Sequence, residues 1–412
     1  MSLRRASVRF AIVALVTSAA AALLVQRGEA HKAITSKYTY NDDVFPIFRE
    51  RCSRCHVAGG VAPMSLMTYD DAFPWAESIR AELVAAHMPP WNAEEGFGDL
   101  KRAHTLSPKE LDVVLTWATG GNPRGALDAK LPEVTLNTGW SGGAPDLALR
   151  LPADFTLAAD KMEDMAEFTL PTSVAEPRWV RAVDLLPGTP SIVRSATIFV
   201  KDAADAADSA APAPERVLAH WLPGQDSEPI DAGIAFRLPA AAQIGVRIHY
   251  KKTWQFEGKA LSDRSTVGIY FAPAKEAHEL LMLPIDSPAG AGTQKQTLTF
   301  GRTLGDDLRA VALSPDNVPP NITLQVEAVH PDGSRTPIIR LNTRADWDRR
   351  YWFEKPLALS RGTKIEVTAN FEDPDLLSAA FASPTATGAA PRSAPMRLTL
   401  NVVSSKLPPT AP

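Results

Sequence analysis

The chain has 412 residues, of which 45% are hydrophobic and 22% are charged, with a net charge of −4 and a mean hydropathy of −0.11. This is the composition of an ordinary globular protein, and it excludes a mostly disordered chain, a collagen-like fibre and a multi-span membrane protein. Lysine and arginine form no basic stripe, so nucleic-acid binding is not expected. At about 100–200 residues per domain, the chain has room for two to four domains.

The first thirty residues have the pattern of an export signal. Arginines precede the uncharged run Phe10–Val25, and small residues at Gly28 and Ala30 fit a cleavage site. We therefore predict a signal peptide over residues 1–30 and a periplasmic or otherwise exported protein. The alternative is an uncleaved N-terminal anchor, and only in that case do we expect contact with a membrane.

Three helices are expected between residues 40 and 125. Apolar residues at helical spacing predict helices over Asn41–Cys52 and Asp71–His87, the second with Thr68 as a possible N-cap. A capping box opens the third helix at Ser107, and the helix is expected to stop at Gly120. This part of the chain is therefore predicted to be small and all-α.

After about residue 145 the pattern changes to short strands separated by proline, glycine and aspartate turns. Such a pattern is typical of antiparallel β-sandwiches, and the length suffices for two of them. The stretches 202–215 and 378–395 are rich in Ala, Pro and Ser, so we expect solvated loops there. The expected strands are Trp179–Leu186, Ile192–Val200, Ile244–Tyr250, Ser265–Phe271, Leu308–Leu313, Ile322–Val329, Lys364–Phe371 and Met396–Val403.

The two cysteines lie three positions apart in the run Cys52–His56, which reads C-S-R-C-H. This is the attachment pattern of haem c: both thiols can form thioethers with one haem, and His56 can bind the iron. A thioredoxin-like dithiol would need a βαβ setting, and a zinc site would need further cysteine or histidine ligands. The motif therefore predicts one covalent haem c on Cys52 and Cys55, with His56 as an axial ligand.

Met88 is the predicted second axial ligand of the iron. It lies 32 residues after His56, and the two prolines that follow would hold its loop in place. Met64 and Met67 lie too close to His56 in sequence to cross to the opposite face of a haem. The alternatives are His87 as the ligand, or an open sixth position.

The stretch Tyr40–Gly125 resembles the cytochrome c domain that precedes a copper type II, ascorbate-dependent monooxygenase-like region in bacterial proteins. The matching segments are DVFPIFRERCSRCH, APMSLMTYDDAFPWAESI, MPPW and SPKELDVVLTWATGG. The rest of the chain resembles the two tandem jelly-roll sandwiches of the same family, which is related to peptidylglycine alpha-hydroxylating monooxygenase. Its landmarks include GWSGGAPDLAL, EPRWVRAVDLLPG, LAHWLPG, RIHY and KPLALSRGTKIEVTANFED.

This resemblance implies a multidomain fold, with a small all-α cytochrome c domain followed by two all-β antiparallel jelly-roll sandwiches. The implied ranges are 38–126 for the cytochrome c domain, 145–275 for the first sandwich and 276–405 for the second.

The resemblance also implies six copper ligands, of which this sequence retains two. His249 matches one histidine of the electron-delivering copper, and Met396 matches the methionine of the oxygen-activating copper. Val193–Arg194 and 316–318 stand where the family has its other histidines, so copper is possible but not expected. If the alignment were shifted, the replacement ligands would be His220, His278 or His330.

The sequence thus predicts an exported mono-haem cytochrome that transfers single electrons, with a β module that docks an unidentified redox partner or a scaffold. The alternative is a copper-dependent monooxygenase fed with electrons by its own haem domain, and a third possibility is a gas sensor with a five-coordinate haem. Whether the chain is an enzyme is left open, and no catalytic residue is assigned.

Overall fold

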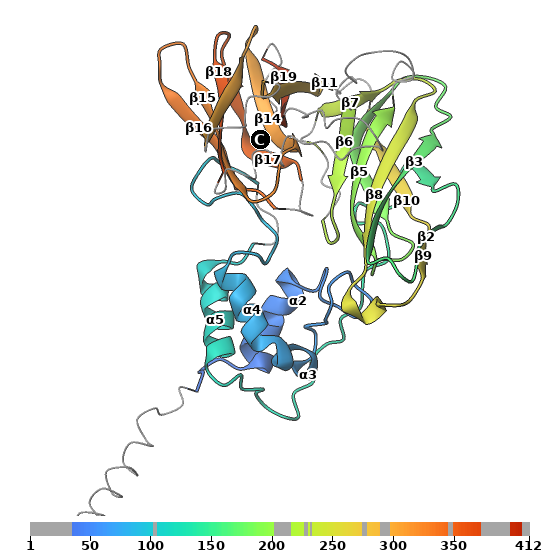
Figure 1. Ribbon diagram of the computed structural model, residues 1–412, viewed down its shortest axis with the longest axis vertical. Helices are drawn as coiled ribbons and strands as arrows, with labels where there is room; N and C mark the ends of the chain where they lie inside the picture. Colours follow the sequence, from blue (N-terminus) through green and yellow to red (C-terminus); the bar gives the residue numbers. More distant parts are fainter. Residues whose placement is uncertain are drawn as a thin grey trace, which may run out of the picture.

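The computed structural model describes residues 35–101, 105–201, 216–225, 230, 233–273, 278–288, 297–344, 349–371 and 396–405. The predicted signal peptide and the two predicted loops, 202–215 and 378–395, lie outside these ranges. No helix among the described residues is long and apolar enough to cross a membrane. Figure 1 shows a small helical part and two larger β parts.

The helical part contains only short elements. A π-helical turn, η2 (Tyr40–Val44), leads into α2 (Phe45–Arg51). The second expected helix is broken into α3 (Tyr69–Ala72), η3 (Phe73–Trp75) and α4 (Ala76–Val84). The break coincides with Pro74, whose ring cannot sit inside a regular helix.

Helix α5 (Pro108–Thr119) begins where the sequence predicted. The Ser107 side chain accepts a hydrogen bond from the Glu110 backbone, and the Glu110 carboxylate accepts one from the Ser107 backbone. This reciprocal pair satisfies two amide donors that the first turn would otherwise leave unpaired. The helix buries Trp117 against Tyr40 and Phe48, which form the aromatic centre of the helical core.

The first sheet pair consists of a sheet in the order β1-β10-β4-β7-β11 and a sheet in the order β3-β8-β5-β6, which share one hydrophobic core. A two-stranded sheet, β2-β9, and a 3₁₀ turn, η5 (Trp254–Phe256), lie beside it. The strands are β1 (Leu147–Arg150), β2 (Phe155–Leu157), β3 (Glu163–Pro171), β4 (Arg178–Leu186), β5 (Val193–Lys201), β6 (Arg216–Trp221), β7 (Ile234–Leu238), β8 (Gln243–Lys251), β9 (Leu261–Asp263), β10 (Thr266–Phe271) and β11 (His278–Glu279).

The second sheet pair consists of the sheets β12-β19-β14-β17 and β13-β18-β15-β16 around a second core. Both cores are built from alternating residues: in β15, for example, every second side chain is buried. The strands are β12 (Leu281–Asp286), β13 (Thr297–Thr303), β14 (Leu308–Asn317), β15 (Ile322–Val329), β16 (Arg335–Asn342), β17 (Tyr351–Leu359), β18 (Lys364–Phe371) and β19 (Arg397–Ser404).

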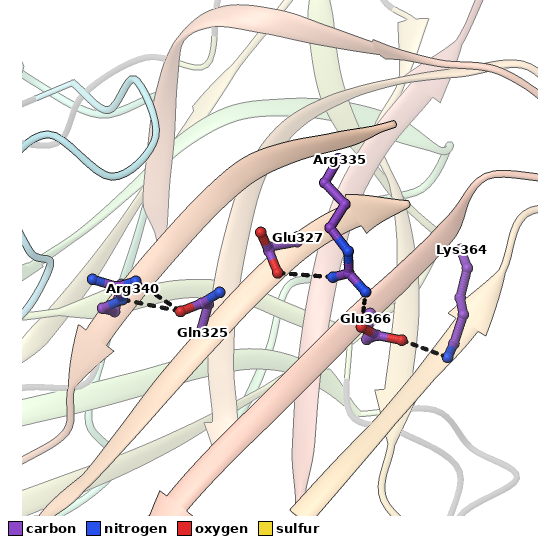
Figure 2. Close-up of polar contacts among 6 residues, drawn as sticks. All are labelled: Gln325, Glu327, Arg335, Arg340, Lys364 and Glu366. Atoms are coloured by element: carbon purple, nitrogen blue, oxygen red, sulfur yellow. Dashed lines mark hydrogen bonds and ion pairs between the residues drawn. The ribbon is translucent and has the colours of Figure 1, made fainter. Parts of the chain in front are cut away.

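Polar side chains cover the outer face of one sheet of the second pair (Figure 2). The Arg335 guanidinium lies 2.9 Å from a Glu327 carboxylate oxygen and 2.8 Å from one of Glu366, which joins three strands. Exposed pairs of this kind contribute little stability each, so the face is a solvated exterior rather than a second core. The residues drawn are Gln325, Glu327, Arg335, Arg340, Lys364 and Glu366.

Arg350 connects the two sheet pairs. Its guanidinium donates to the Leu218 carbonyl at 2.9 Å and to the Val217 carbonyl at 2.7 Å, both in β6. It also lies 5.0 Å from the ring centroid of Phe236 and 5.6 Å from that of Trp352. Burial lowers the pKa of Arg350 to about 10, so the side chain is still charged at neutral pH. This charge lies at the junction between the two sheet pairs.

The predicted fold class requires correction. In the described chain 43% of the residues are in strands and the helices have at most 12 residues, which contradicts the predicted all-α cytochrome c domain followed by jelly-roll sandwiches. Ala93 pairs with Leu341 and Leu100 pairs with Phe353, and both lie in the second β core. The expected two all-antiparallel jelly-roll sandwiches are corrected to four larger sheets, in which β11 runs parallel to β7.

The residues from Trp91 to Lys101 therefore form a strap that lies across the second sheet pair. A substitution at Gly98 tests whether the strap packs on β16. Gly98 has φ +79°, and a Cβ there would overlap the Ile338 carbonyl oxygen of β16, whereas Gly96 has φ +80° with open space around it. We expect Gly96→Ala to cost about 1–2 kcal/mol from backbone strain alone. Gly98→Ala should cost about 1–3 kcal/mol more, from overpacking. Equal losses in urea unfolding would show that the strap does not pack on β16.

Candidate functional site

The principal cavity of the helical part is an apolar pocket of about 400 Å³. It lies between α2, α4, α5 and the loop that follows α2, and Arg194 of the first sheet pair also lines it. Pockets of this size accommodate organic ligands and cofactors. The apolar side chains lining it are Ile47, Phe48, Val61, Ala62, Pro63, Met64, Leu66, Trp75, Ile79, Leu83, Met88, Pro89, Pro90, Leu106 and Val114.

The structure brings Cys52, Cys55, His56 and Met88 together in the wall of this one pocket. Cys52 caps the end of α2, where its N–H donates to the Phe48 carbonyl at 2.9 Å. The chain then turns tightly, because the N–H groups of Cys55 and His56 both donate to the Cys52 carbonyl, at 3.1 and 2.8 Å. This turn presents both thiols and the imidazole to the same cavity.

His56 is held in one tautomer. Its Nδ1 lies 3.2 Å from the Met64 carbonyl oxygen, which can only accept, so Nδ1 carries the proton and Nε2 is the acceptor of the ring. Burial, aided by the nearby Arg194 charge, lowers the pKa of His56 in spite of the opposing hydrogen bond to Met64. A neutral imidazole with a fixed orientation can bind a ligand through Nε2.

The two thiols are held in their protonated form. Burial, followed by the mutual effect of the cysteine pair, raises the pKa of Cys52 to about 12. Burial likewise raises the pKa of Cys55 to about 11, against the opposing charges of Arg194, Arg54 and Arg349. A thiolate is the reactive form of cysteine, so both are poor nucleophiles at neutral pH in the unmodified protein.

His87, the alternative to Met88, does not line the pocket. Its ring lies 3.0 Å from a Glu82 carboxylate oxygen, and its side chain is 45% exposed. Met88 instead follows the last turn of α4 and lines the pocket together with Pro89 and Pro90. Of these two residues, Met88 is the one that lines the pocket.

The loop after β6 contacts the cysteine motif beside the pocket. Arg54 donates to the Gly224 carbonyl at 3.0 Å, and the Cys55 thiol donates to the Pro223 carbonyl at 3.6 Å. Gly224 has φ +72°, and a Cβ there would press on the Arg54 side chain, so this close approach favours glycine. This contact joins two parts of the chain that are about 170 residues apart in the sequence.

Sequence reasoning missed Arg54 and Arg194 as pocket residues. Arg54 stands inside the C-x-x-C-H motif at a position that the motif leaves unspecified. Arg194 was considered only as the residue at a lost histidine position, whereas the structure places it in the pocket wall, next to Cys55 and His56. No signal in the sequence connects β5 with the cysteine motif.

The two positions predicted to remain from a copper site are not brought together. His249 lies in β8, where its Nε2 is 2.6 Å from a Glu163 carboxylate oxygen, in the first sheet pair. Met396 is 1% exposed and belongs to the core of the second sheet pair. His249 and Met396 therefore lie in different sheet pairs and do not form one site.

The prediction of a covalent haem c with its iron is wrong. The prediction of cytochrome c electron transfer, which depended on it, is wrong as well. Within the described ranges, no group of three or more His, Cys, Asp or Glu side chains is placed to hold a metal ion. The described part of the chain is predominantly β with few short helices, unlike the fold that this prediction required. What the structure retains of the predicted site is the apolar pocket and the four side chains in its wall.

Comparison with known proteins assigns no family. No protein-family model matches the chain, and no curated protein matches it. Among solved structures, an allantoicase is similar at 10% identity and a TM-score of 0.14, covering 51% of this chain and 74% of that one. An oxalate decarboxylase of Bacillus subtilis is similar at 8% identity and a TM-score of 0.14, covering 75% of this chain and 87% of that one.

The raised thiol pKa values predict how stability changes with pH. In the unmodified protein, unfolded thiols ionise near pH 8.5, whereas the folded ones stay protonated until about pH 11. Their contribution to the free energy of unfolding is therefore fully present below about pH 8 and is lost as the pH rises toward 11. We expect urea unfolding between pH 7 and 10.5 to show this loss.

Lysine and tyrosine titrate over the same range, so the control is the double variant Cys52→Ala, Cys55→Ala. Its stability should decrease less steeply between pH 8 and 10.5 than that of the parent protein. Identical slopes for the two proteins would contradict the assignment of protonated thiols.

Proposed function

We propose that the chain is a ligand-binding protein whose site is the apolar pocket of the helical part. The observation that carries this proposal is the apolar pocket of about 400 Å³, which lies beside the core of the helical part. Keeping the apolar walls of such a pocket in contact with water is costly, because apolar surface gains free energy when it leaves water. A resident or incoming organic ligand removes that cost.

The residues of the wall indicate how such a ligand is held. Apolar side chains from α2, α4 and α5 supply non-directional burial, which favours a ligand that is mostly hydrocarbon or aromatic. His56 Nε2 and the Met88 thioether are the directional contacts, and the thiols of Cys52 and Cys55 line the same cavity. One acceptor nitrogen and one soft sulfur can orient a ligand that the apolar walls alone would leave free to rotate.

A matched pair of variants in α4 tests the site. Leu83 lines the pocket, whereas its neighbour Val84 is 63% exposed and faces away from it. We expect the full chain, produced in a bacterial cytoplasm, to bind the neutral probe N-phenyl-1-naphthylamine at one saturable site. Leu83→Glu should weaken that binding about tenfold or more, because the ligand would desolvate a carboxylate.

Val84→Glu adds the same charge to the same helix and should bind the probe like the parent protein. Absence of saturable binding, or equal weakening by both substitutions, would contradict the proposal. Native mass spectrometry of the exported protein then identifies any molecule that co-purifies.

We also propose that the chain is exported, on the basis of the arginine-led apolar run Phe10–Val25, which lies outside the described residues. The protein isolated from the periplasm should begin near His31 when its N-terminus is sequenced. A protein that remains in the cytoplasm with residues 2–30 intact would contradict this proposal.

A further inference from the structure

The segment that follows α4 forms one wall of the apolar pocket. Met88, Pro89 and Pro90 all line the pocket. Met88 and Pro89 also line a second cavity of about 370 Å³, which Asn92 and Ala93 of the strap line as well. The segment is therefore a wall that the two cavities share, and its position determines the shape of the apolar pocket.

Backbone donors of the helices and of the segment itself cannot fix this wall along its whole length. The N–H of Met88 still donates to the Glu82 carbonyl, at 3.3 Å. Pro89 and Pro90 have no N–H group, so neither can donate a hydrogen bond. Their rings fix φ, so an anchor on one carbonyl removes much of the conformational freedom that remains.

The anchor comes from the second sheet pair. Arg349, two residues before β17, donates to the Pro90 carbonyl at 2.8 Å. The same guanidinium lies 5.5 Å from the ring centroid of Trp91, within the range of a cation–π interaction. Trp91 packs edge-on against Tyr351, with ring centroids 5.4 Å apart, and Tyr351 belongs to the second core. These contacts connect the wall of the pocket to the core of the second sheet pair.

Two further observations place the second sheet pair beside the pocket. Arg344, two residues after β16, donates at 3.4 Å to the carbonyl of Ala85, the residue that caps the end of α4. Burial raises the pKa of Cys55 and the Arg349 charge opposes this effect, so the guanidinium lies near the cysteine motif as well. Burial also lowers the pKa of Arg349 itself, in agreement with its position between these elements.

We propose that Arg349 is a positioning residue of the pocket, which holds Met88 and Pro89 in the shared wall through its hydrogen bond to the Pro90 carbonyl. This inference rests on the proposed ligand-binding function and adds the part of the chain that controls it. A wall that is ordered in advance does not have to be ordered when the ligand binds, so the ligand binds more tightly. The second sheet pair thus contributes to affinity without touching the ligand.

The position of Met88 can be followed without any ligand. The chain has eight methionines, and labelling them with carbon-13 at the methyl group gives each its own NMR signal. The Met88 signal is identified by its loss in Met88→Ala. We expect Arg349→Leu to shift or broaden this signal, while those of the exposed residues Met162 and Met165 stay unchanged.

Arg340→Leu is the matched control for this measurement. Arg340 also joins the second sheet pair to the strap, because it donates to Glu94 at 3.0 Å and to Gln325 at 2.8 Å, but it does not contact the wall. Its loss should leave the Met88 signal in place. Arg349→Gln, which stays polar but is too short to reach the same carbonyl, replaces Arg349→Leu if the latter does not fold.

Titration with N-phenyl-1-naphthylamine then measures the effect on binding, at a temperature at which circular dichroism shows every variant to be folded. Arg349→Leu should weaken binding about fivefold, because the wall must then be ordered by the ligand. Arg349→Lys keeps a charged donor and should bind within about twofold of the parent protein. In the Met88→Ala background, Arg349→Leu should change the affinity by less than about twofold, because the side chain that it positions is gone.

The inference is overturned if the Met88 signal is unchanged in Arg349→Leu, or if Arg340→Leu moves it equally. It is also overturned if Arg349→Leu weakens binding as much in the Met88→Ala background as in the parent, or if Arg349→Lys does not restore it. If the parent protein does not bind the probe, the proposed ligand-binding function fails, whereas the NMR comparison still decides whether Arg349 positions Met88.

Discussion

The contact between the cysteine motif and the loop after β6 determines the form of the rest of the site. Arg54 and Cys55 both donate to consecutive carbonyl groups, those of Gly224 and Pro223. These two hydrogen bonds attach the helical part to the first sheet pair at the edge of the pocket. Arg54 and Cys55 also line the pocket, so the contact fixes part of its wall to the first sheet pair.

The same contact explains why the pocket is both apolar and charged. The helices contribute hydrocarbon, as expected for a cluster that is closed by Tyr40, Phe48 and Trp117. The first sheet pair contributes the guanidinium of Arg194, which lies in β5. A binding site at the junction of two such units can combine surfaces that neither unit could build alone.

The sequence predicted those features that depend on neighbouring residues. The start of α5 follows from the capping box at Ser107, and the turn that gathers the thiols and His56 follows from their spacing. Strands such as β4 and β15 follow from alternation, within a residue or two of their observed ends. These elements are decided by local hydrogen bonding and by burial on one face, which leave a direct mark in the sequence.

Features that depend on contacts between distant segments were not predictable. Ala93 and Leu100 have no strand pattern around them, and only their pairing partners give them a place in the second core. Arg194 lines the pocket because β5 lies next to the cysteine motif. The hydrophobic periodicity of the sequence contains no information about this arrangement. The assignment of a cofactor and an activity from the cysteine motif went beyond what the spacing alone can determine, since spacing describes a turn and not the cavity around it.

The strap between the helices and the second sheet pair has a consequence for how the chain is assembled. Ala93 and Leu100 find their partners about 250 residues later in the sequence, in β16 and β17. Closing so long a loop is entropically costly and kinetically slow, so the strap cannot settle until most of the polypeptide has been synthesised. Met88 and Pro90, which precede the strap and line the pocket, therefore reach their final positions late, although the ribosome makes them early.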